Sequence, residues 1–152
     1  MAEYSLQRET IVRKPIAEVF DFFSRAENLV RLTPPWLNFR ILTPLPIEMR
    51  AGATIAYKLR VRGFPVTWRS EIAVWNPPFE FVDVQLQGPY QSWHHTHRFS
   101  ELENGTRIED VVRYSLPFGL LGDWANRLLV ASDLDKIFTY RGQEVRRLFA
   151  LS

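Results

Sequence analysis

The feature that most constrains this chain is a series of alternating segments that ends in one long amphipathic stretch. Between residues 37 and 114, apolar and polar side chains alternate in six stretches of strand length, separated by residues such as Pro, Gly and Asn. Period-two alternation predicts strands with one buried face, and short separators predict antiparallel neighbours. The segment 121–149 instead repeats its apolar residues at helical spacing. This stripe begins with Trp124 and Leu128, and we expect Trp124 to belong to the core or the cavity wall. A sheet of consecutive strands must therefore bury one face against a single long helix.

The segment before residue 37 adds one strand and two short helices. Residues 4–12 favour a strand, and Pro15 suits the first position of a helix over 16–23. A second short helix over 26–32 should end before the prolines that follow it. We therefore predict one α+β domain over 1–152, with a curved seven-stranded antiparallel sheet, two short helices and a long C-terminal helix over a cavity.

Composition excludes several classes of protein. The chain has no cysteine, so it has neither disulfides nor a thiolate nucleophile. A net charge of +2 is too weak to indicate a nucleic-acid partner. No apolar run is long enough to span a membrane and no signal-peptide pattern is seen, so we expect a cytoplasmic protein. Aromatic residues make up 14% of the chain, and such rings fill a core or line a cavity.

The stretch 93–99 carries the most unusual pattern of side chains. In a strand, Trp93, His95, His97 and Phe99 share one face, while His94 lies on the other. Imidazole in apolar surroundings needs hydrogen-bond partners, so this face indicates a lined pocket. The alternative is that both histidines are buried structural groups, satisfied by carboxylates or by the backbone.

A hairpin should bring a carboxylate and a phenol to the same place. The pair Asn104-Gly105 predicts a tight turn between 93–99 and a following strand. In either register of that hairpin, Asp110 and Tyr114 share the face of the histidines and lie within a residue or two of them. We therefore expect a polar cluster on this face.

The strand 79–87 has two faces that compete for the inside. Asp83 and Gln85 share one face with apolar rings, whereas Val82 and Val84 share the other. Hydrophobicity alone favours the aliphatic face.

Several short motifs occur together over nearly the whole chain. They are Asn28-Leu29 with Pro34-Pro35, Trp68-x-Ser70-x-Ile72, Phe81-Val82-Asp83-x-Gln85-x-x-Gly88-Pro89-Tyr90, Trp93-x-His95-x-His97-x-Phe99, Gly105-Thr106-x-x-x-Asp110-x-x-x-Tyr114-x-Leu116-Pro117 and Phe138-x-Tyr140-Arg141. In this combination the sequence resembles the START-like, or SRPBCC, superfamily. That superfamily includes the Bet v 1 pollen allergens, lipid-transfer domains and bacterial polyketide cyclase/dehydrases, and the chain looks most like the last, ligand-binding subgroup.

The resemblance implies a helix-grip fold with a ligand cavity, and it favours Asp83 and Gln85 facing inward. It does not imply one reaction, because the superfamily includes carriers, receptors and enzymes. The residues that we expect to bind a ligand are Trp68, Asp83, Gln85, Trp93, His95, His97, Asp110, Tyr114, Leu134 and Phe138.

A metal site is an alternative use of the histidines. The spacing His95-x-His97 suits two metal ligands, and Asp110 or Asp83 would be a third. All three histidines of the chain lie within 94–97, so no distant histidine completes such a site. We therefore predict no metal and no cofactor.

Three functions are compatible with these residues. The first is a non-catalytic carrier or sensor of a hydrophobic, oxygen-bearing small molecule. The second is a cyclase or dehydratase in which His95 or His97 acts as general base, Asp110 holds it and Tyr114 stabilises an enolate.

The third function is a lipid shuttle at a membrane surface, which would use the basic residues of the long helix. These residues are Arg127, Lys136, Arg146 and Arg147. Such charges are also typical of the solvated face of a core helix. Arg141, on the same helix, would either reach an anionic ligand group at the cavity mouth or form a surface ion pair.

Overall fold

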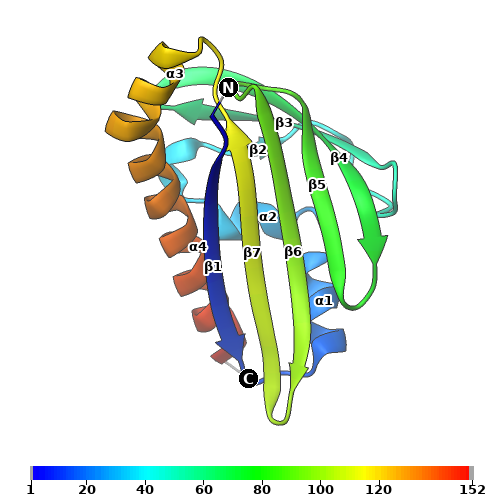
Figure 1. Ribbon diagram of the computed structural model, residues 1–152. Coiled ribbons are helices and arrows are strands. Elements are labelled where there is room, and N and C mark those ends of the chain that lie inside the picture. The colour runs from blue at the N-terminus through cyan, green and yellow to red at the C-terminus, as the bar shows by residue number, and fades with distance from the viewer. Residues whose placement is uncertain (1, 151–152) are drawn as a thin grey trace.

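The computed structural model describes residues 2–150 as a curved antiparallel sheet with helices against its inner face (Figure 1). The strands are β1 (Tyr4–Val12), β2 (Arg40–Ile41), β3 (Thr54–Val61), β4 (Phe64–Asn76), β5 (Glu80–Gln87), β6 (Ser92–Leu102) and β7 (Gly105–Ser115). The helical elements are α1 (Ile16–Phe23), α2 (Asn28–Leu32), the 3₁₀ turn η1 (Pro35–Leu37), α3 (Leu120–Ala125), the π-helical turn η2 (Asn126–Val130) and α4 (Ala131–Ala150).

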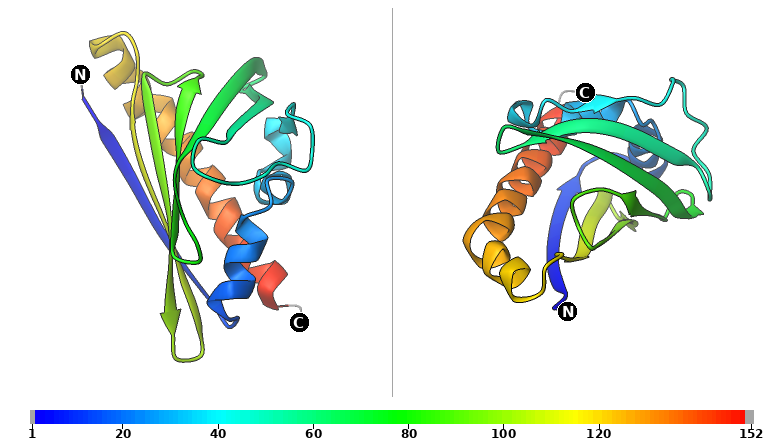
Figure 2. Two further views of the ribbon diagram at one scale, coloured as in Figure 1. Left: turned by 90° about the vertical axis from the view of Figure 1, so that its right-hand side faces the viewer. Right: turned by 90° about the horizontal axis from the view of Figure 1, so that it is seen from above.

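The seven strands form one sheet in the order β1-β7-β6-β5-β4-β3-β2, and every pair is antiparallel. The first strand therefore lies beside the last, and the others follow as a meander. Against β5, β4 carries two register irregularities, and such bulges bend a strand. The sheet curves round α4, as the two views of Figure 2 show. The predicted α+β helix-grip fold is confirmed.

The β6–β7 hairpin forms where the sequence predicts it, but its turn lies one residue earlier. Leu102 pairs with Gly105, so the two turn residues are 103 and 104. Gly105 is needed for a different reason: a Cβ there would lie 2.1 Å from the carbonyl oxygen of Val12. This glycine lets the end of β1 approach the hairpin closely.

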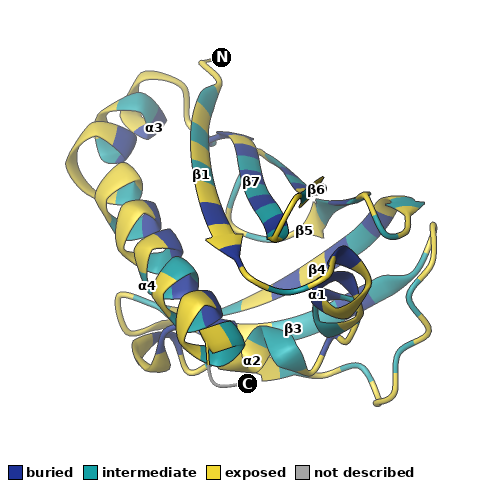
Figure 3. Ribbon diagram, turned by 90° about the horizontal axis from the view of Figure 1, so that it is seen from below, coloured by how far each residue is buried: buried dark blue, intermediate teal, exposed yellow. Residues whose placement is uncertain are grey.

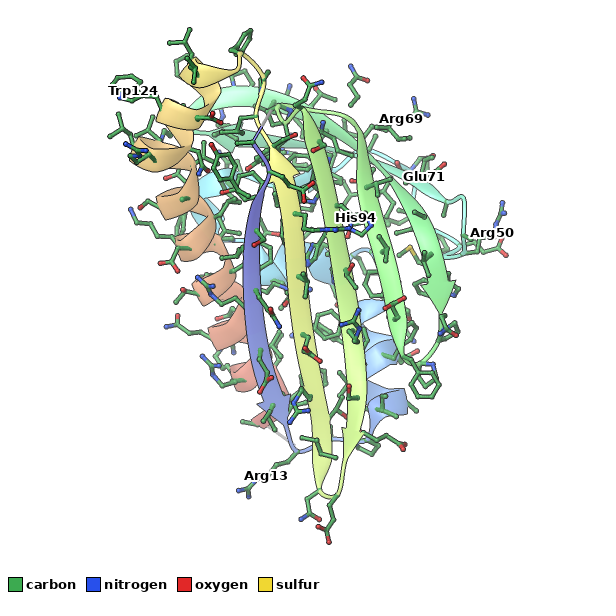
Figure 4. The ribbon with its side chains drawn as sticks, in the orientation of Figure 1. Arg13, Arg50, Arg69, Glu71, His94 and Trp124 are labelled. Atoms are coloured by element: carbon green, nitrogen blue, oxygen red, sulfur yellow. The ribbon has the colours of Figure 1, made fainter. Side chains whose placement is uncertain are left out.

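The long C-terminal helix is continuous, but the predicted apolar stripe fails over its first third. The helical path runs from Leu120 to Ala150 and includes the π-helical turn. An extra residue in one turn rotates the stripe, so residues that a 3.6-residue period places together separate there. Trp124 and Leu128 are 63% and 52% exposed, and Figure 4 shows Trp124 directed away from the sheet. The expectation that Trp124 belongs to the core or the cavity wall is wrong.

Two apolar clusters fill the interior, and buried residues of α4 face the sheet (Figure 3). The first cluster packs α1 on the sheet, with Phe20 against Phe81 and Phe99. The second joins β7 to α4 through residues that include Val112 and Phe138. The polar side chains described below lie between these clusters.

Removing a ring from the first cluster should destabilise the fold strongly. Phe99 is 2% exposed, so Phe99→Ala should lower the free energy of unfolding by about 3–5 kcal/mol through lost burial and a residual cavity. Phe64 is 74% exposed, and Phe64→Ala is the matched control, expected to change it by about 0.5 kcal/mol or less. Urea denaturation of the three proteins measures both values. Equal losses in the two variants would contradict this packing.

Candidate functional site

A cavity of about 830 Å³ lies between the inner face of the sheet and α4. Strand β3 sends Ile55, Tyr57, Leu59 and Val61 into it, because alternate residues of a strand share one face. Cavities of this size accommodate whole small-molecule ligands.

Aromatic rings form much of the cavity wall, and Trp68 is their centre. Its ring centroid lies 5.2 Å from that of Trp93, 5.4 Å from Tyr90 and 5.9 Å from Tyr57. All four residues line the cavity. The wall is therefore aromatic over this region, although Nε1 of Trp68 is buried without a hydrogen-bond partner among the described residues.

Five polar side chains meet beside another part of the wall: Asp83 of β5, His95 and His97 of β6, Asp110 of β7 and Arg141 of α4. All of them except Asp110 line the cavity. Nε2 of His95 lies 2.8 Å from Oδ1 of Asp110, and Nε2 of His97 lies 2.6 Å from Oδ2 of Asp83. The strand register explains the meeting, because His95 is opposite Asp83 and His97 is opposite Asp110. The two imidazole rings stack with their centroids 3.7 Å apart. We call these five residues the polar cluster.

Arg141 joins α4 to the polar cluster. Its Nε donates to Oδ2 of Asp110 over 3.3 Å, and an Nη2 proton points at Nδ1 of His97, also over 3.3 Å. The guanidinium lies over the ring of Phe23 and is buried. Both expectations for Arg141 are thus corrected, since it is neither at the cavity mouth nor in a surface ion pair.

These contacts determine which nitrogen of the His97 ring carries the proton. Arg141 can donate to Nδ1 only if that nitrogen keeps its lone pair, so the ring proton is on Nε2 and is donated to Asp83. Burial, helped by the neighbouring His95, lowers the pKa of His97 to about 4, although Asp83 acts in the opposite direction. His97 is therefore uncharged at neutral pH.

The two carboxylates of the polar cluster are held in the charged form. Burial alone would raise the pKa of Asp110, but Arg141 and the hydrogen bond from His95 hold it well below its usual range. Burial also opposes ionisation of Asp83, yet the hydrogen bond from His97 and the nearby His95 lower its pKa. Each carboxylate is thus stabilised by named donors rather than by water.

A second polar contact on the cavity wall is neutral. The hydroxyls of Tyr57 and Ser70 lie 2.9 Å apart and bond each other. Burial, with Asp83 adding to it, raises the pKa of Tyr57 well above its usual value. The pair therefore presents uncharged hydroxyls to the cavity.

The mouth of the cavity is bridged by an ion pair. Nε and Nη2 of Arg62, in the β3–β4 turn, donate to the two carboxylate oxygens of Asp133 on α4 over 2.9 and 2.8 Å. Arg62 has a φ of +50°, which a two-residue hairpin turn requires. Both residues are partly exposed, so water reaches this bridge.

The structure places seven of the ten expected ligand-binding residues on the cavity wall. These are Trp68, Asp83, Trp93, His95, His97, Leu134 and Phe138.

Three expected residues do not line the cavity, and each has a different reason. Gln85 turns its amide to the backbone of Tyr90, with which it forms two hydrogen bonds. Tyr114 is buried in the second apolar cluster and donates to Asn126 over 2.7 Å, so it does not face a ligand as an enolate stabiliser. Asp110 lies behind the histidines and is occupied by His95 and Arg141.

Among the polar wall residues, Tyr57 was missed as a ligand contact, and Arg141 was expected to reach a ligand only at the cavity mouth. Arg141 follows Leu134 and Phe138 at helical spacing and precedes Val145, so all four share one face. That spacing was the available signal. An arginine on a buried stripe indicates a buried carboxylate partner, here Asp110.

The metal alternative can be compared with this geometry. Asp83, His95 and His97 offer ligand atoms that all lie within 4.8 Å of one another. However, both nitrogens of His97 already have partners, and Arg141 places a positive charge beside them. The arrangement fits a hydrogen-bonded network better than a set of metal ligands, and the absence of a metal stays a prediction.

A family profile matches this chain over residues 12–137. The family is described as polyketide cyclase / dehydrase and lipid transport. No curated protein sequence matches the chain.

Solved structures show the same fold at low sequence identity. A protein from Chromobacterium violaceum is 11% identical with a TM-score of 0.75, covering 98% of this chain and 99% of its own. The major latex-like protein 151 of Panax ginseng is 8% identical with a TM-score of 0.69, covering 97% of each chain. A nucleoside-diphosphate sugar epimerase from Corynebacterium glutamicum is 27% identical with a TM-score of 0.66. That match covers 91% of this chain but only 28% of the longer epimerase chain.

The neutral, buried His97 predicts a pH-dependent stability. Between about pH 4 and about pH 6.5 the unfolded chain protonates this histidine while the folded protein does not, so the free energy of unfolding should rise with pH. The difference amounts to roughly 3 kcal/mol across that window. Urea denaturation at several pH values measures it. His97→Gln should flatten the slope, whereas His94→Gln, on the outer face of the sheet in Figure 4, should keep it. An unchanged slope in His97→Gln would refute the neutral state.

Proposed function

The chain belongs to the polyketide cyclase / dehydrase and lipid transport family, and from this premise we propose that it is a carrier or sensor of a hydrophobic, oxygen-bearing small molecule. The ligand would occupy the cavity between the sheet and α4. The observation that carries the proposal is the cavity itself: about 830 Å³, walled by aromatic and aliphatic side chains, with one polar cluster.

The walls supply affinity and the polar cluster supplies orientation. A ligand that buries about 300 Å² of apolar surface gains roughly 7 kcal/mol before the cost of association. A hydrogen bond to a charged group stabilises the complex only when the polar atom of the ligand lies within bonding distance of that group. A molecule with an apolar body and one polar group fits this division.

The mouth is compatible with exchange of a ligand. The partly exposed pair of Arg62 and Asp133 joins the β3–β4 turn to α4 at this point. Exposed ion pairs contribute roughly 0–1 kcal/mol, so opening this bridge costs little.

A second candidate is a cyclase or dehydratase that uses His95. His95 lines the cavity, and its Nε2 lies 2.8 Å from Asp110, which would orient the ring as a general base. His97 is less suited, because both of its nitrogens are engaged. Tyr114 cannot help, because its hydroxyl is committed to Asn126.

The lipid-shuttle alternative has less support from α4. Acidic residues such as Asp133, Asp135 and Glu144 are interleaved with the basic ones, and Glu144 pairs with Arg147. A continuous positive face is therefore missing from the described part of this helix. Within residues 2–150, no helix is both long and apolar enough to cross a membrane.

Binding in the cavity can be tested with diphenylhexatriene, a hydrocarbon dye that fluoresces in apolar surroundings. The protein should bind one dye molecule per chain. Leu59 lines the cavity, so Leu59→Asp should weaken binding at least about ten-fold, since a carboxylate in the wall disfavours a hydrocarbon. Leu86 is 52% exposed and lies outside the cavity wall, so Leu86→Asp is the control and should bind normally. Equal binding by both folded variants would place the dye elsewhere and defeat the proposal.

A carrier and an enzyme can be distinguished by whether the bound ligand is recovered unchanged or as a product. A carrier should release an aromatic polyketide unchanged, as mass spectrometry of the recovered ligand would show. An enzyme should convert it, and His95→Gln should then abolish turnover while binding of diphenylhexatriene is kept, because catalysis depends on the transition state. We expect unchanged ligand; a product that disappears in His95→Gln would establish the enzyme instead.

A further inference from the structure

The hydrogen-bonding capacity of the polar cluster is used almost completely within the protein. Both nitrogens of His97 have partners, and both oxygens of Asp110 accept from His95 or Arg141. Arg141 in turn donates from Nε to Asp110 and from Nη2 to His97. A ligand that enters the cavity therefore finds few free polar atoms.

Asp83 is the carboxylate of the cluster with an unused oxygen, and Nδ1 of His95 is a second atom beside it without a hydrogen-bond partner among the described residues. Its Oδ2 accepts from His97, whereas Oδ1 has no hydrogen-bond partner among the described residues. The Asp83 side chain lines the cavity and keeps 18% of its surface exposed, compared with 3% for His97 and 10% for Asp110 and Arg141. The accessible part of the polar cluster is thus a carboxylate.

The neighbouring nitrogen of His95 does not satisfy this carboxylate. Nδ1 of His95 lies 3.7 Å from Oδ2 of Asp83, which is too far for a hydrogen bond. The Nε2 of the same ring is committed to Asp110. Asp83 therefore accepts a hydrogen bond from His97 but not from His95, and it can accept another from a ligand beside it.

The charges of the polar cluster favour the same kind of ligand group. Two carboxylates face a single guanidinium, and that guanidinium binds Asp110 rather than Asp83. A second anion placed beside Asp83 in an apolar cavity would be repelled. A hydrogen-bond donor on the ligand would instead be attracted to the carboxylate of Asp83.

We propose that Asp83 is the polar anchor of the cavity, that it accepts a hydrogen bond from a donor group on the ligand, and that the cavity selects hydroxyl, phenol or protonated amine groups over carboxylates. The inference rests on the proposed function and deepens it. It replaces His97, which has no free nitrogen, as the contact for the ligand's polar group.

Two other kinds of wall group compete with Asp83 for this role, nitrogen donors and a hydroxyl pair. The donors are Arg141 and the buried Nε1–H of Trp68, which has no hydrogen-bond partner among the described residues. Arg141 would favour an anionic ligand, and the Tyr57–Ser70 hydroxyl pair would accept or donate without regard to charge. Each competitor predicts a different ranking of ligands. The experiment below therefore separates the three.

The test uses four naphthalene probes that displace diphenylhexatriene from the unmodified protein at pH 7.5. They carry a hydroxyl (2-naphthol), an ammonium (2-naphthylmethylamine), a methoxy group (2-methoxynaphthalene) or a carboxylate (2-naphthoate). A hydrogen bond to a charged acceptor should make 2-naphthol bind about ten-fold tighter than 2-methoxynaphthalene. The ammonium should also exceed the methoxy compound, and 2-naphthoate should bind most weakly. The first two probes show whether a neutral or a charged donor is preferred.

Two variants assign the preference to a residue. Asp83→Asn keeps an oxygen for His97 and turns a donor amide toward the cavity, so the advantage of 2-naphthol should vanish and 2-naphthoate should improve. Tyr57→Phe breaks the Tyr57–Ser70 hydroxyl pair without altering charge and should leave the ranking unchanged. Binding of diphenylhexatriene by each variant verifies that its cavity is intact.

Several results would overturn the proposal. Tightest binding of 2-naphthoate to the unmodified protein would assign the anchor to a nitrogen donor, Arg141 or Trp68, instead of Asp83. Loss of the ranking in Tyr57→Phe would assign it to the hydroxyl pair, and equal binding of all four probes would mean that no polar anchor exists. The ranking on the unmodified protein decides even if Asp83→Asn fails to fold. Failure of the proposed function looks different, because diphenylhexatriene itself would then not bind.

Discussion

The interior depends on the pairing of two carboxylates, the buried Asp110 and the half-buried Asp83, with one guanidinium and two imidazoles. Asp83, His97, Asp110 and Arg141 link three neighbouring strands to α4 through hydrogen bonds of 2.6–3.3 Å. A buried charge without partners costs several kcal/mol, so each carboxylate requires its donor. The polar cluster also separates the two apolar clusters, since His97 stacks on Phe81 of one and His95 lies against Phe138 of the other.

This pairing also explains why a cavity persists beside it. The sheet curves away from α4. Two of the polar contacts that hold the helix to it lie on the cavity wall, Arg141 at the polar cluster and Asp133 at the β3–β4 turn. A further one, between Asp135 and Arg8 of β1, lies outside the wall. Asp133 and Arg141 are about 12 Å apart along the axis. Between them, Leu134 and Phe138 belong to the second apolar cluster and also contribute to the cavity lining, because the sheet bends away beside them. The cavity is thus a consequence of curvature and of two fixed contacts.

The fold could be predicted well because hydrophobic alternation, turn residues and helical spacing indicate the same arrangement along most of the sequence. Alternation located the strands, and the hairpin signal brought Asp110 near the histidines, as the observed pairing of His97 with Asp110 shows. The wrong predictions have physical causes that the alternation of apolar and polar residues cannot reveal. A π-helical turn displaced Trp124 from the predicted stripe, and local bonds turned Gln85 and Tyr114 away from the cavity.

What a single sequence could not predict is which polar atoms remain free. Residue types give the donors and acceptors available, but their use depends on distances between strands and helix that no periodicity encodes. Arg141 shows this most clearly: its helical spacing places it on the buried face, yet only the structure shows that it serves Asp110 and thereby leaves Asp83 without a cation. Apolar walls accept many ligands of suitable size, and aromatic rings add little discrimination between polar groups. Selectivity in such a cavity must come from the atoms that the protein has not satisfied by itself, because only those atoms gain a hydrogen bond when a ligand arrives.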